Sequence, residues 1–422
     1  MLNVANSSNA STLSNVATSP NAPPPIMSAR QLNLDLDPLL SVEPAKPWAA
    51  DLLRHCARAF TDKDSANLHR LLWMLNELAS PYGDCEQRLT YAFLQALFCR
   101  ATASGDHCYS TSHAVAERTV SFASTRRLAL KFQEAAPWST FGHVAANGAL
   151  LQALDGEPAL HIIDVSNTFC TQWPTLLEAF TSRADADAPR ALLTVVSSTA
   201  AGVVAEIEAR IEKFARLMGV PLEFQAIVAL ALLRLADTLR PEKLELREGE
   251  AVAVNCVGAL RRAGCGDSWE SFLWVAAALR PRVLTVVEDE ANFGAAGEFM
   301  ESFEECLQFY GSYFEMLEEI SQRRATSGLL WRGSASGASS DCWRARAAQT
   351  QWWTVSEGRQ WCRRLERCSF ETFGVSDDVI DDLKALLKRY RPGWLLLPTE
   401  GETSGMYLTW KDKIRNLFNS HY

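Results

Sequence analysis

Hydrophobic positions repeat with two different periods along the chain, and the change occurs near residue 156. From residue 47 to about 155 the period is helical. The clearest apolar stripe recurs every three or four positions and consists of Leu68, Leu71, Leu72, Leu75 and Leu78. Such spacing places the side chains on one face of a helix. The same pattern predicts further helices over residues 86–100, 125–134 and 139–154.

Beyond residue 158 the apolar segments become short and rich in β-branched residues. They begin about 30 residues apart, at 160–164, 192–196, 222–228, 251–256 and 283–287, and helical patterns fill the intervals. Strands that alternate with helices imply a parallel sheet covered on both faces. Because crossovers between parallel strands are right-handed, we expect a doubly wound, Rossmann-like α/β sheet.

The last hundred residues extend this pattern. A long acidic helix is predicted over 297–321, and a second helix over 377–390 has Ser376 as its cap. Two strands, 394–397 and 406–410, are separated by glycines and are predicted to form a hairpin. Sheets of methyltransferase type also end in a helix and a hairpin. An S-adenosylmethionine-dependent small-molecule methyltransferase is therefore the alternative that the sequence must be tested against.

Residues 1–46 differ in composition from the rest. They are rich in Asn, Ser, Ala, Thr and Pro, and Arg30 is the only basic residue before Lys46. Such a segment buries too little apolar area to offset the entropy of ordering. We therefore predict a disordered tail over 1–46, a helical cap over 47–155 and a Rossmann-like core over 156–422.

Charge and composition exclude several classes of protein. The 422 residues carry 41 Lys and Arg against 50 Asp and Glu, a net charge of −9, which argues against a protein that grips nucleic acid mainly by neutralising phosphates. The longest apolar runs are far shorter than the roughly 18 residues of a membrane span. Eleven cysteines without a CxxC pair, and no evident secretory signal, indicate reduced thiols in the cytosol or nucleus and predict no metal site.

The position of a cofactor site in such a sheet can be examined directly. Ligands bind beyond the carboxyl ends of the strands, and nucleotide-type cofactors need glycines after the first strand. Here Asp164 ends that strand, no glycine occurs from 157 to 201, and the bulky Phe169 and Trp173 follow. The second strand ends in Ser197 and Ser198 rather than in an acid. We therefore predict a cofactor site that is filled or absent, no bound cofactor and no catalytic residue.

Structural roles explain the same polar residues. His161 alternates with Leu and Ile in a strand and is predicted to be a hydrogen-bonded core residue. Asp164 is expected to accept hydrogen bonds from backbone amides of the segment that follows. The acidic run Glu288, Asp289 and Glu290 ends the fifth strand, where it forms either a solvated loop or a docking surface for a basic partner.

Several motifs together resemble a known family. Leu160-His161-Ile162-Ile163-Asp164, followed by Trp173-Pro174, resembles the VHIID motif of the GRAS family of plant transcriptional regulators. Residues 48–97 are similar to the first leucine-rich region of that family, and 141–148 to part of the second. The segments most similar to the SHORT-ROOT branch are 124–126, 131–138, 168–179, 213–221 and 255–259.

The resemblance implies a helical cap on a methyltransferase-like core that has lost catalysis. It implies a co-regulator that pairs with a SCARECROW-like GRAS protein, docks on BIRD (indeterminate-domain) zinc-finger proteins and reaches DNA mainly through partners. It also implies action in root radial patterning and asymmetric cell division, in nucleus and cytoplasm, with movement between cells. By this analogy, candidate partner-binding residues are Leu68, Leu71, Leu75, Arg88 and Phe93 in the cap, with Glu288, Asp289 and Glu290 on the core.

Two segments depart from the family pattern. Residues 321–360 lack a helical period and concentrate Trp331, Trp343, Trp352 and Trp353, which suggests an out-of-frame segment. After Trp410 the chain lacks the Ser-Ala-Trp-like ending of the family. We therefore expect the last strand of the sheet to be missing.

Overall fold

A computed structural model describes residues 48–102, 104, 121–165, 171–182, 188–197, 201–228, 235–258, 260, 267–291, 299–321, 358–399 and 405–422. The chain divides into two units between Lys46 and Pro47, and every described residue lies in the second. The predicted disordered tail and most of the atypical segment 321–360 fall outside these ranges.

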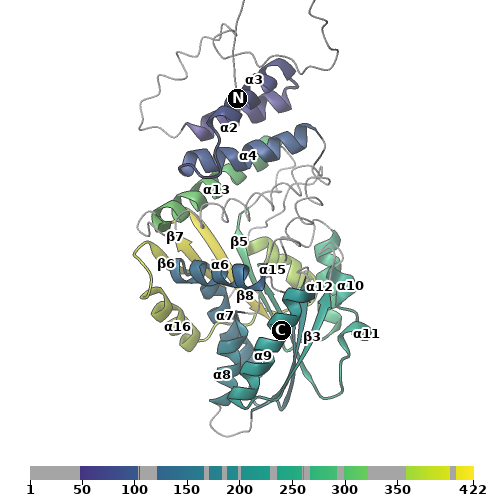
Figure 1. The fold of residues 1–422 in the computed structure, drawn as a ribbon. Helices are drawn as coiled ribbons and strands as arrows, with labels where there is room; N and C mark the ends of the chain where they lie inside the picture. Colours follow the sequence, from purple (N-terminus) through teal and green to yellow (C-terminus); the bar gives the residue numbers. More distant parts are fainter. Residues whose placement is uncertain are drawn as a thin grey trace, which may run out of the picture. The chain divides into compact units, whose positions relative to one another are not determined.

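An eight-stranded sheet forms the centre of the second unit, in the order β3-β2-β1-β4-β5-β8-β7-β6 (Figure 1). Its strands are β1 Ala159–Asp164, β2 Arg190–Ser197, β3 Leu222–Val228, β4 Ala251–Val257, β5 Val283–Glu290, β6 Trp394–Pro398, β7 Met406–Trp410 and β8 Ile414–His421. Strands β1 to β5 are parallel, whereas β8, β7 and β6 continue the sheet antiparallel. The predicted Rossmann-like sheet and its terminal hairpin are confirmed.

Strand β8 corrects the expectation that the last strand is missing. It lies between β5 and β7 and pairs with both. Lys411 and Asp412 have φ angles of 50° and 55°, and Lys413 N donates to Trp410 O at 2.9 Å, which is the geometry of a tight hairpin turn. The strand is buried at every position but Arg415, so its sequence shows no alternation that would reveal it.

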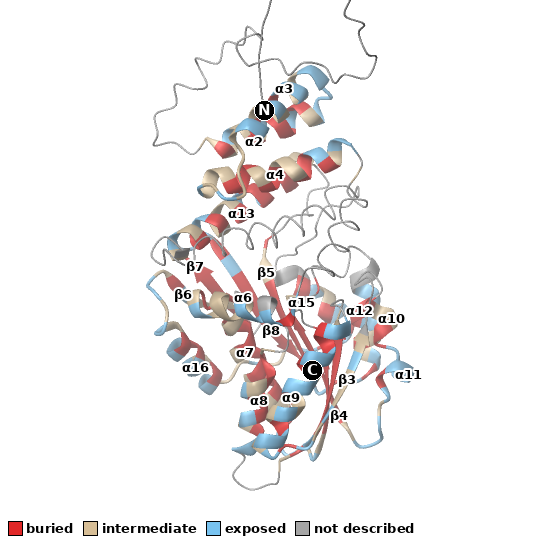
Figure 2. Ribbon diagram, viewed as in Figure 1, coloured by how far each residue is buried: buried red, intermediate tan, exposed pale blue. Residues whose placement is uncertain are grey.

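Both faces of the sheet are covered by helices, as neighbouring residues of β1 show. Ile162 belongs to one apolar cluster and Ile163 to the other. The first cluster includes α7 Trp138–Ala153, α8 Trp173–Thr181, α9 Ala201–Met218 and α16 Asp377–Leu387; the second includes α10 Leu235–Thr238, α11 Pro241–Leu244, α12 Asp267–Ala278 and α15 Gly358–Arg367. Figure 2 shows the strands buried between these layers. None of the described helices has the length and apolarity that a bilayer span requires.

A helical bundle, whose core is continuous with the first apolar cluster, is formed by α2 Ala49–Thr61, α3 Ser65–Leu78, α4 Cys85–Ala101 and α13 Phe299–Ser321. Local signals explain where α3 and α4 begin. The Asp64 side chain accepts from Asn67 N at 3.1 Å, and Asp84 forms a capping box with Gln87. Leu71 and Leu75 are buried in the bundle, which confirms the apolar stripe.

The predicted division at residue 155 does not follow the packing. Helix α13 comes late in the sequence but completes the bundle, where Arg54 Nε donates to Glu304 Oε2 at 2.7 Å. Helix α7 comes before the boundary but lies on the sheet beside β5 and β8, next to α6 Phe122–Ala135. The contact is close, because a Cβ added at Gly142 would lie 2.7 Å from Val287 Cγ1. Cap and core are therefore interleaved along the chain.

Candidate functional site

The carboxyl ends of β1 and β4 carry a buried polar network. Asp164 is the last residue of β1 and lies beside Asn255 of β4 in the register of the sheet. The Asn255 amide donates to Asp164 Oδ1 at 3.2 Å, and the Trp173 indole nitrogen donates to Asp164 Oδ2 at 2.8 Å. Asp164 and Trp173 are each only 1% exposed. These two partners are side chains; most of the segment whose backbone amides we expected to bind Asp164, residues 166–170, lies outside the described ranges.

Gln172 extends this network toward the helices. Its amide donates to Asn147 Oδ1 of α7 at 2.9 Å and accepts from Asn255 Nδ2 at 3.1 Å. On the other side, Thr285 of β5 donates to Asn255 Oδ1 at 2.8 Å. All four side chains are buried. Buried amides that satisfy one another in this way fix a single arrangement of the side chains.

The network occupies the place where this type of sheet binds ligands. The strand order reverses between β1 and β4, and that crevice is the usual ligand site. Here the Trp173 indole, at the first residue of α8, covers the Asp164 carboxylate, and Gln172 joins Asn255 of β4 to Asn147 of α7. Phe169, the second predicted bulky residue, lies outside the described ranges.

The remaining residues of the VHIID motif are core residues. His161 is fully buried, and its Nε2 lies 2.8 Å from Thr194 Oγ1, which matches the predicted structural role. Burial lowers the pKa of His161, although the Glu250 carboxylate, 3.4 Å from Nδ1, opposes that shift. Ile162 and Ile163 fill opposite faces of the sheet. The motif therefore builds the interior and presents no described reactive group to solvent.

The acidic run at the end of β5 is bound to its own chain. Glu288 Oε1 accepts from Leu260 N at 2.6 Å, and Asp289 Oδ1 accepts from the Trp138 indole at 3.0 Å. Glu290 Oε1 accepts from the Tyr407 hydroxyl at 3.4 Å. Glu288 is only 2% exposed. The expectation of a solvated acidic loop is wrong, because these residues continue a strand that neighbouring elements cover.

A sequence model of one family matches this architecture over almost its whole length. The model is that of the GRAS domain family, and it matches residues 49–418. The chain belongs to the GRAS domain family. The GRAS resemblance inferred from the VHIID and leucine-rich motifs is thereby confirmed.

Curated relatives place this GRAS protein among plant developmental regulators of transcription. Protein SHORT-ROOT of Arabidopsis thaliana is 43% identical over 387 residues, covering 87% of this chain and 71% of the relative. Protein SHORT-ROOT 2 of Oryza sativa subsp. indica is 42% identical over 417 residues, covering 87% and 68%. A crystal structure of SCL7 in Oryza sativa shares the fold, with a TM-score of 0.71 at 22% identity over 90% of this chain and all of that one.

The cap residues predicted to bind partners lie mostly inside this GRAS chain. Arg88 is 1% exposed, where its guanidinium binds the Glu318 carboxylate of α13 and lies over the Phe314 ring. Phe93, Leu71 and Leu75 are also buried, and only Leu68 is half-buried. These residues join α3 and α4 to their neighbours. An apolar stripe marks the packed side of a helix, so the residues that it indicates lie on the interior face.

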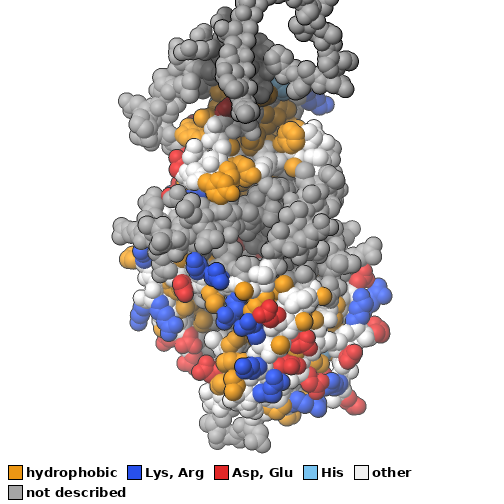
Figure 3. All heavy atoms as spheres, viewed as in Figure 1, with side chains coloured by type: hydrophobic (Ala, Val, Ile, Leu, Met, Phe, Trp, Pro, Cys, Tyr) orange, Lys and Arg blue, Asp and Glu red, His pale blue; other side chains and the backbone are white. Residues whose placement is uncertain are grey.

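Other aromatic side chains of the bundle, which the apolar stripe did not indicate, are exposed. Trp73 of α3, Tyr82 between α3 and α4, and Phe98 of α4 are 56%, 66% and 55% exposed. Figure 3 shows hydrophobic side chains gathered over this bundle. Their signal in the sequence is an aromatic residue outside the apolar stripe. Large exposed aromatic side chains are typical of protein-binding surfaces.

The described residues were also compared with the requirements of a metal site and of a reactive cysteine. Within them, no group of three or more His, Cys, Asp and Glu side chains could hold a metal ion. Burial raises the pKa of the Cys56 thiol to about 12 and that of Cys256 well above its ordinary value. Both thiols therefore stay protonated at neutral pH and are poor nucleophiles.

Proposed function

We propose that this GRAS protein is a noncatalytic regulator of transcription that acts in the nucleus by binding other proteins, in the manner of SHORT-ROOT. Its partners are a SCARECROW-type GRAS protein and BIRD zinc-finger proteins, and its processes are root radial patterning and asymmetric cell division. The observation that carries the proposal is the Trp173–Asp164–Asn255 network in the cofactor crevice, in a chain 43% identical to a protein named SHORT-ROOT.

The network supports a role without catalysis. A cofactor bound beside Asp164 would have to displace the Trp173 indole and break its 2.8 Å hydrogen bond. It would also have to break the contacts between Asn255 and Gln172. Losing partners in a buried polar network costs about 1–3 kcal/mol for each unsatisfied group. This cost opposes S-adenosylmethionine binding and leaves the fold as a scaffold.

The exposed aromatic face of the bundle supports a protein partner. We define the cap face as Trp73, Tyr82 and Phe98, which are each more than half exposed. A SCARECROW-like protein built on the same fold presents similar helices, so pairing would bury both faces. Aromatic side chains contribute strongly to such interfaces. The buried Arg88–Glu318 pair would hold α4 and α13 in position behind the cap face.

Charge supports indirect contact with DNA. The net charge of −9 does not favour binding to phosphates, so a zinc-finger partner would supply the DNA contact. The protein would then act in the nucleus while also occupying the cytoplasm and moving between cells.

A reconstitution experiment tests this proposal. The full chain is mixed with a purified SCARECROW-type protein, and complex formation is measured by size-exclusion chromatography and calorimetry. The variant Trp73→Arg/Phe98→Arg should weaken binding by at least about tenfold. The matched control is Trp274→Arg on α12, which is 54% exposed on another element and should bind like the wild type. Equal affinity of both variants, or no complex at all, would overturn the assignment.

A second experiment tests the proposed zinc-finger partner. A BIRD protein is added to the preformed complex, and a specific DNA duplex is added last. We expect the ternary complex to bind DNA and the isolated GRAS chain to bind it weakly and without sequence preference. Tight, sequence-specific DNA binding by the GRAS chain alone would contradict the proposed division of roles.

A further inference from the structure

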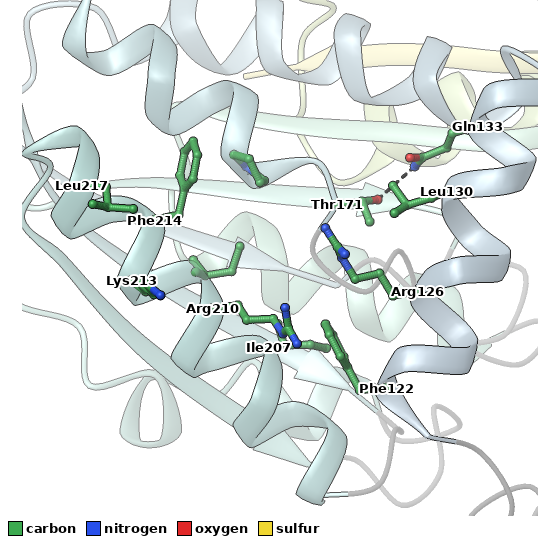
Figure 4. A pocket seen from close by; sticks show the side chains of 12 residues that line it. Phe122, Arg126, Leu130, Gln133, Thr171, Ile207, Arg210, Lys213, Phe214 and Leu217 are labelled. Carbon is green, nitrogen blue, oxygen red and sulfur yellow. Dashed lines mark hydrogen bonds between the residues drawn. The ribbon is translucent and has the colours of Figure 1, made fainter.

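A cavity of about 370 Å³ lies between α6 and α9, on the core and away from the cap face (Figure 4). It is lined by Phe122, Arg126, Leu130, Gln133, Thr171, Pro174, Ile207, Arg210, Ile211, Lys213, Phe214 and Leu217, which we call the α6–α9 groove. Two of the lining residues are joined across the groove, where Gln133 Nε2 donates to Thr171 Oγ1 at 3.0 Å.

The floor of the groove is apolar. Phe122, Ile207 and Ile211 are each 6% exposed and belong to the core. Phe214 lies one turn further along α9 and is half-buried, and Leu217 follows at 75% exposure. Because Leu217 both lines the cavity and is exposed, the apolar floor opens to solvent at the end of this row. An extended peptide can therefore enter the groove from solvent.

The rim of the groove is basic. Arg126 belongs to α6, and Arg210 and Lys213 belong to α9. Figure 4 shows the three side chains around the α6–α9 groove. None of the described lining residues is acidic. Arg210 is held over the Phe122 ring at 4.7 Å and donates to Glu206 at 2.8 Å. Neither Arg126 nor Lys213 has an ion-pair partner within the described part of the chain.

We propose that the α6–α9 groove docks an acidic peptide segment of a partner protein. Its apolar side chains would contact Phe214 and Leu217, and its carboxylates would face Arg126 and Lys213. Charge complementarity favours a negatively charged partner, because a basic segment would be repelled by the basic side chains on the rim. None of the groove residues belongs to the cap face. A failure of peptide binding in the groove would therefore leave the proposed pairing with a SCARECROW-type protein untouched, and the reverse also holds.

Fluorescence anisotropy with the full chain tests the site. The probe is a fluorescein-labelled 14-residue peptide of Leu and Glu with helical spacing, and the comparison peptide has Lys in place of Glu. We expect only the acidic peptide to bind. Arg126→Glu/Lys213→Glu should weaken binding by at least about tenfold, and Leu217→Ala by about threefold. Raising the salt concentration should also weaken binding, since the rim is exposed.

The matched control is Arg127→Glu/Arg216→Glu. It makes the same change of charge on the same two helices, at exposed residues outside the lining. This control should bind within about twofold of the wild type. Three results would overturn the proposal: no binding of the acidic peptide, equal weakening in both double variants, or equal binding of the basic peptide. Dodecanoate is titrated as well, and saturable binding of dodecanoate without binding of the peptide would show a small-molecule site instead.

Discussion

The Trp173 indole nitrogen lies 2.8 Å from Asp164 Oδ2, and both side chains are almost completely buried. In sheets of this type an acid at a strand end commonly faces the bound ligand. Here the carboxylate faces an indole from the helix that follows in the sequence. The Rossmann-like sheet is thus present, and side chains of the chain itself occupy the position beside Asp164 where such sheets bind ligands.

Trp173 should contribute strongly to stability. Trp173→Ala should lower the free energy of unfolding by about 3–5 kcal/mol, because it leaves a large cavity and removes a donor from Asp164. Trp173→Phe should cost less, since most of the volume remains. Urea denaturation measures both. Trp274→Ala, on the exposed part of α12, is the control and should change the value by less than about 1 kcal/mol.

The Arg88–Glu318 pair should behave as a buried ion pair. Arg88→Met leaves the Glu318 carboxylate without this partner and should destabilise the protein by about 3–5 kcal/mol. The double variant Arg88→Met/Glu318→Met should be more stable than Arg88→Met alone, because neither charge then remains buried. A double-mutant cycle by urea denaturation measures the coupling. Additive losses would show that the two residues act independently.

The last strand should be essential to the core. Phe418 of β8 is fully buried between β5 and β7, so Phe418→Ala should cost about 3–5 kcal/mol. Arg415→Ala changes the exposed residue of the same strand and should cost less than about 1 kcal/mol. Thermal unfolding compares the two variants. Similar melting temperatures would mean that β8 does not pack as described.

Two of the buried histidines, His143 and His421, should make the protein sensitive to acid. Burial lowers the pKa of His143 and of His421 to about 4, against roughly 6.5 in an unfolded chain. Between those values the unfolded state binds more protons, so stability is complete above about pH 6.5 and falls as the pH drops toward 4. Each histidine contributes a slope of up to about 1.4 kcal/mol per pH unit.

Urea midpoints at pH 7.5 and 5.0 measure this effect. His143→Gln and His421→Gln should each flatten the dependence on pH, even where they lower stability at pH 7.5. An unchanged slope in both variants would show that other groups cause the loss of stability in acid.

Much of the fold could be predicted from sequence, because its signals are local. The five parallel strands are short aliphatic runs between helices, and α16 begins with Ser376 as its cap, as predicted. Strand β8 could not be found in this way. Its buried Asn416, Asn419 and Ser420 give it the composition of a loop, and only pairing with β5 and β7 makes it a strand.

The candidate site was predictable in part for a related reason. The missing glycines and the bulky Trp173 indicated a filled crevice, but Gln172 and Asn255 are joined across 83 residues and gave no local signal. At the cap, hydrophobic periodicity identified Leu71 and Leu75 correctly as a stripe. Periodicity alone does not distinguish a stripe that packs within the chain from one that packs on a partner. The structure shows that this stripe packs within the chain, whereas Trp73 and Phe98 are exposed.

Calorimetric titration of the full chain with S-adenosylmethionine tests the central claim most directly. If Trp173 and its network fill the crevice beside Asp164, no saturable heat should appear at ligand concentrations up to about 1 mM. S-adenosylhomocysteine should behave in the same way. Saturable binding with a micromolar Kd that Asp164→Ala abolishes would contradict the account.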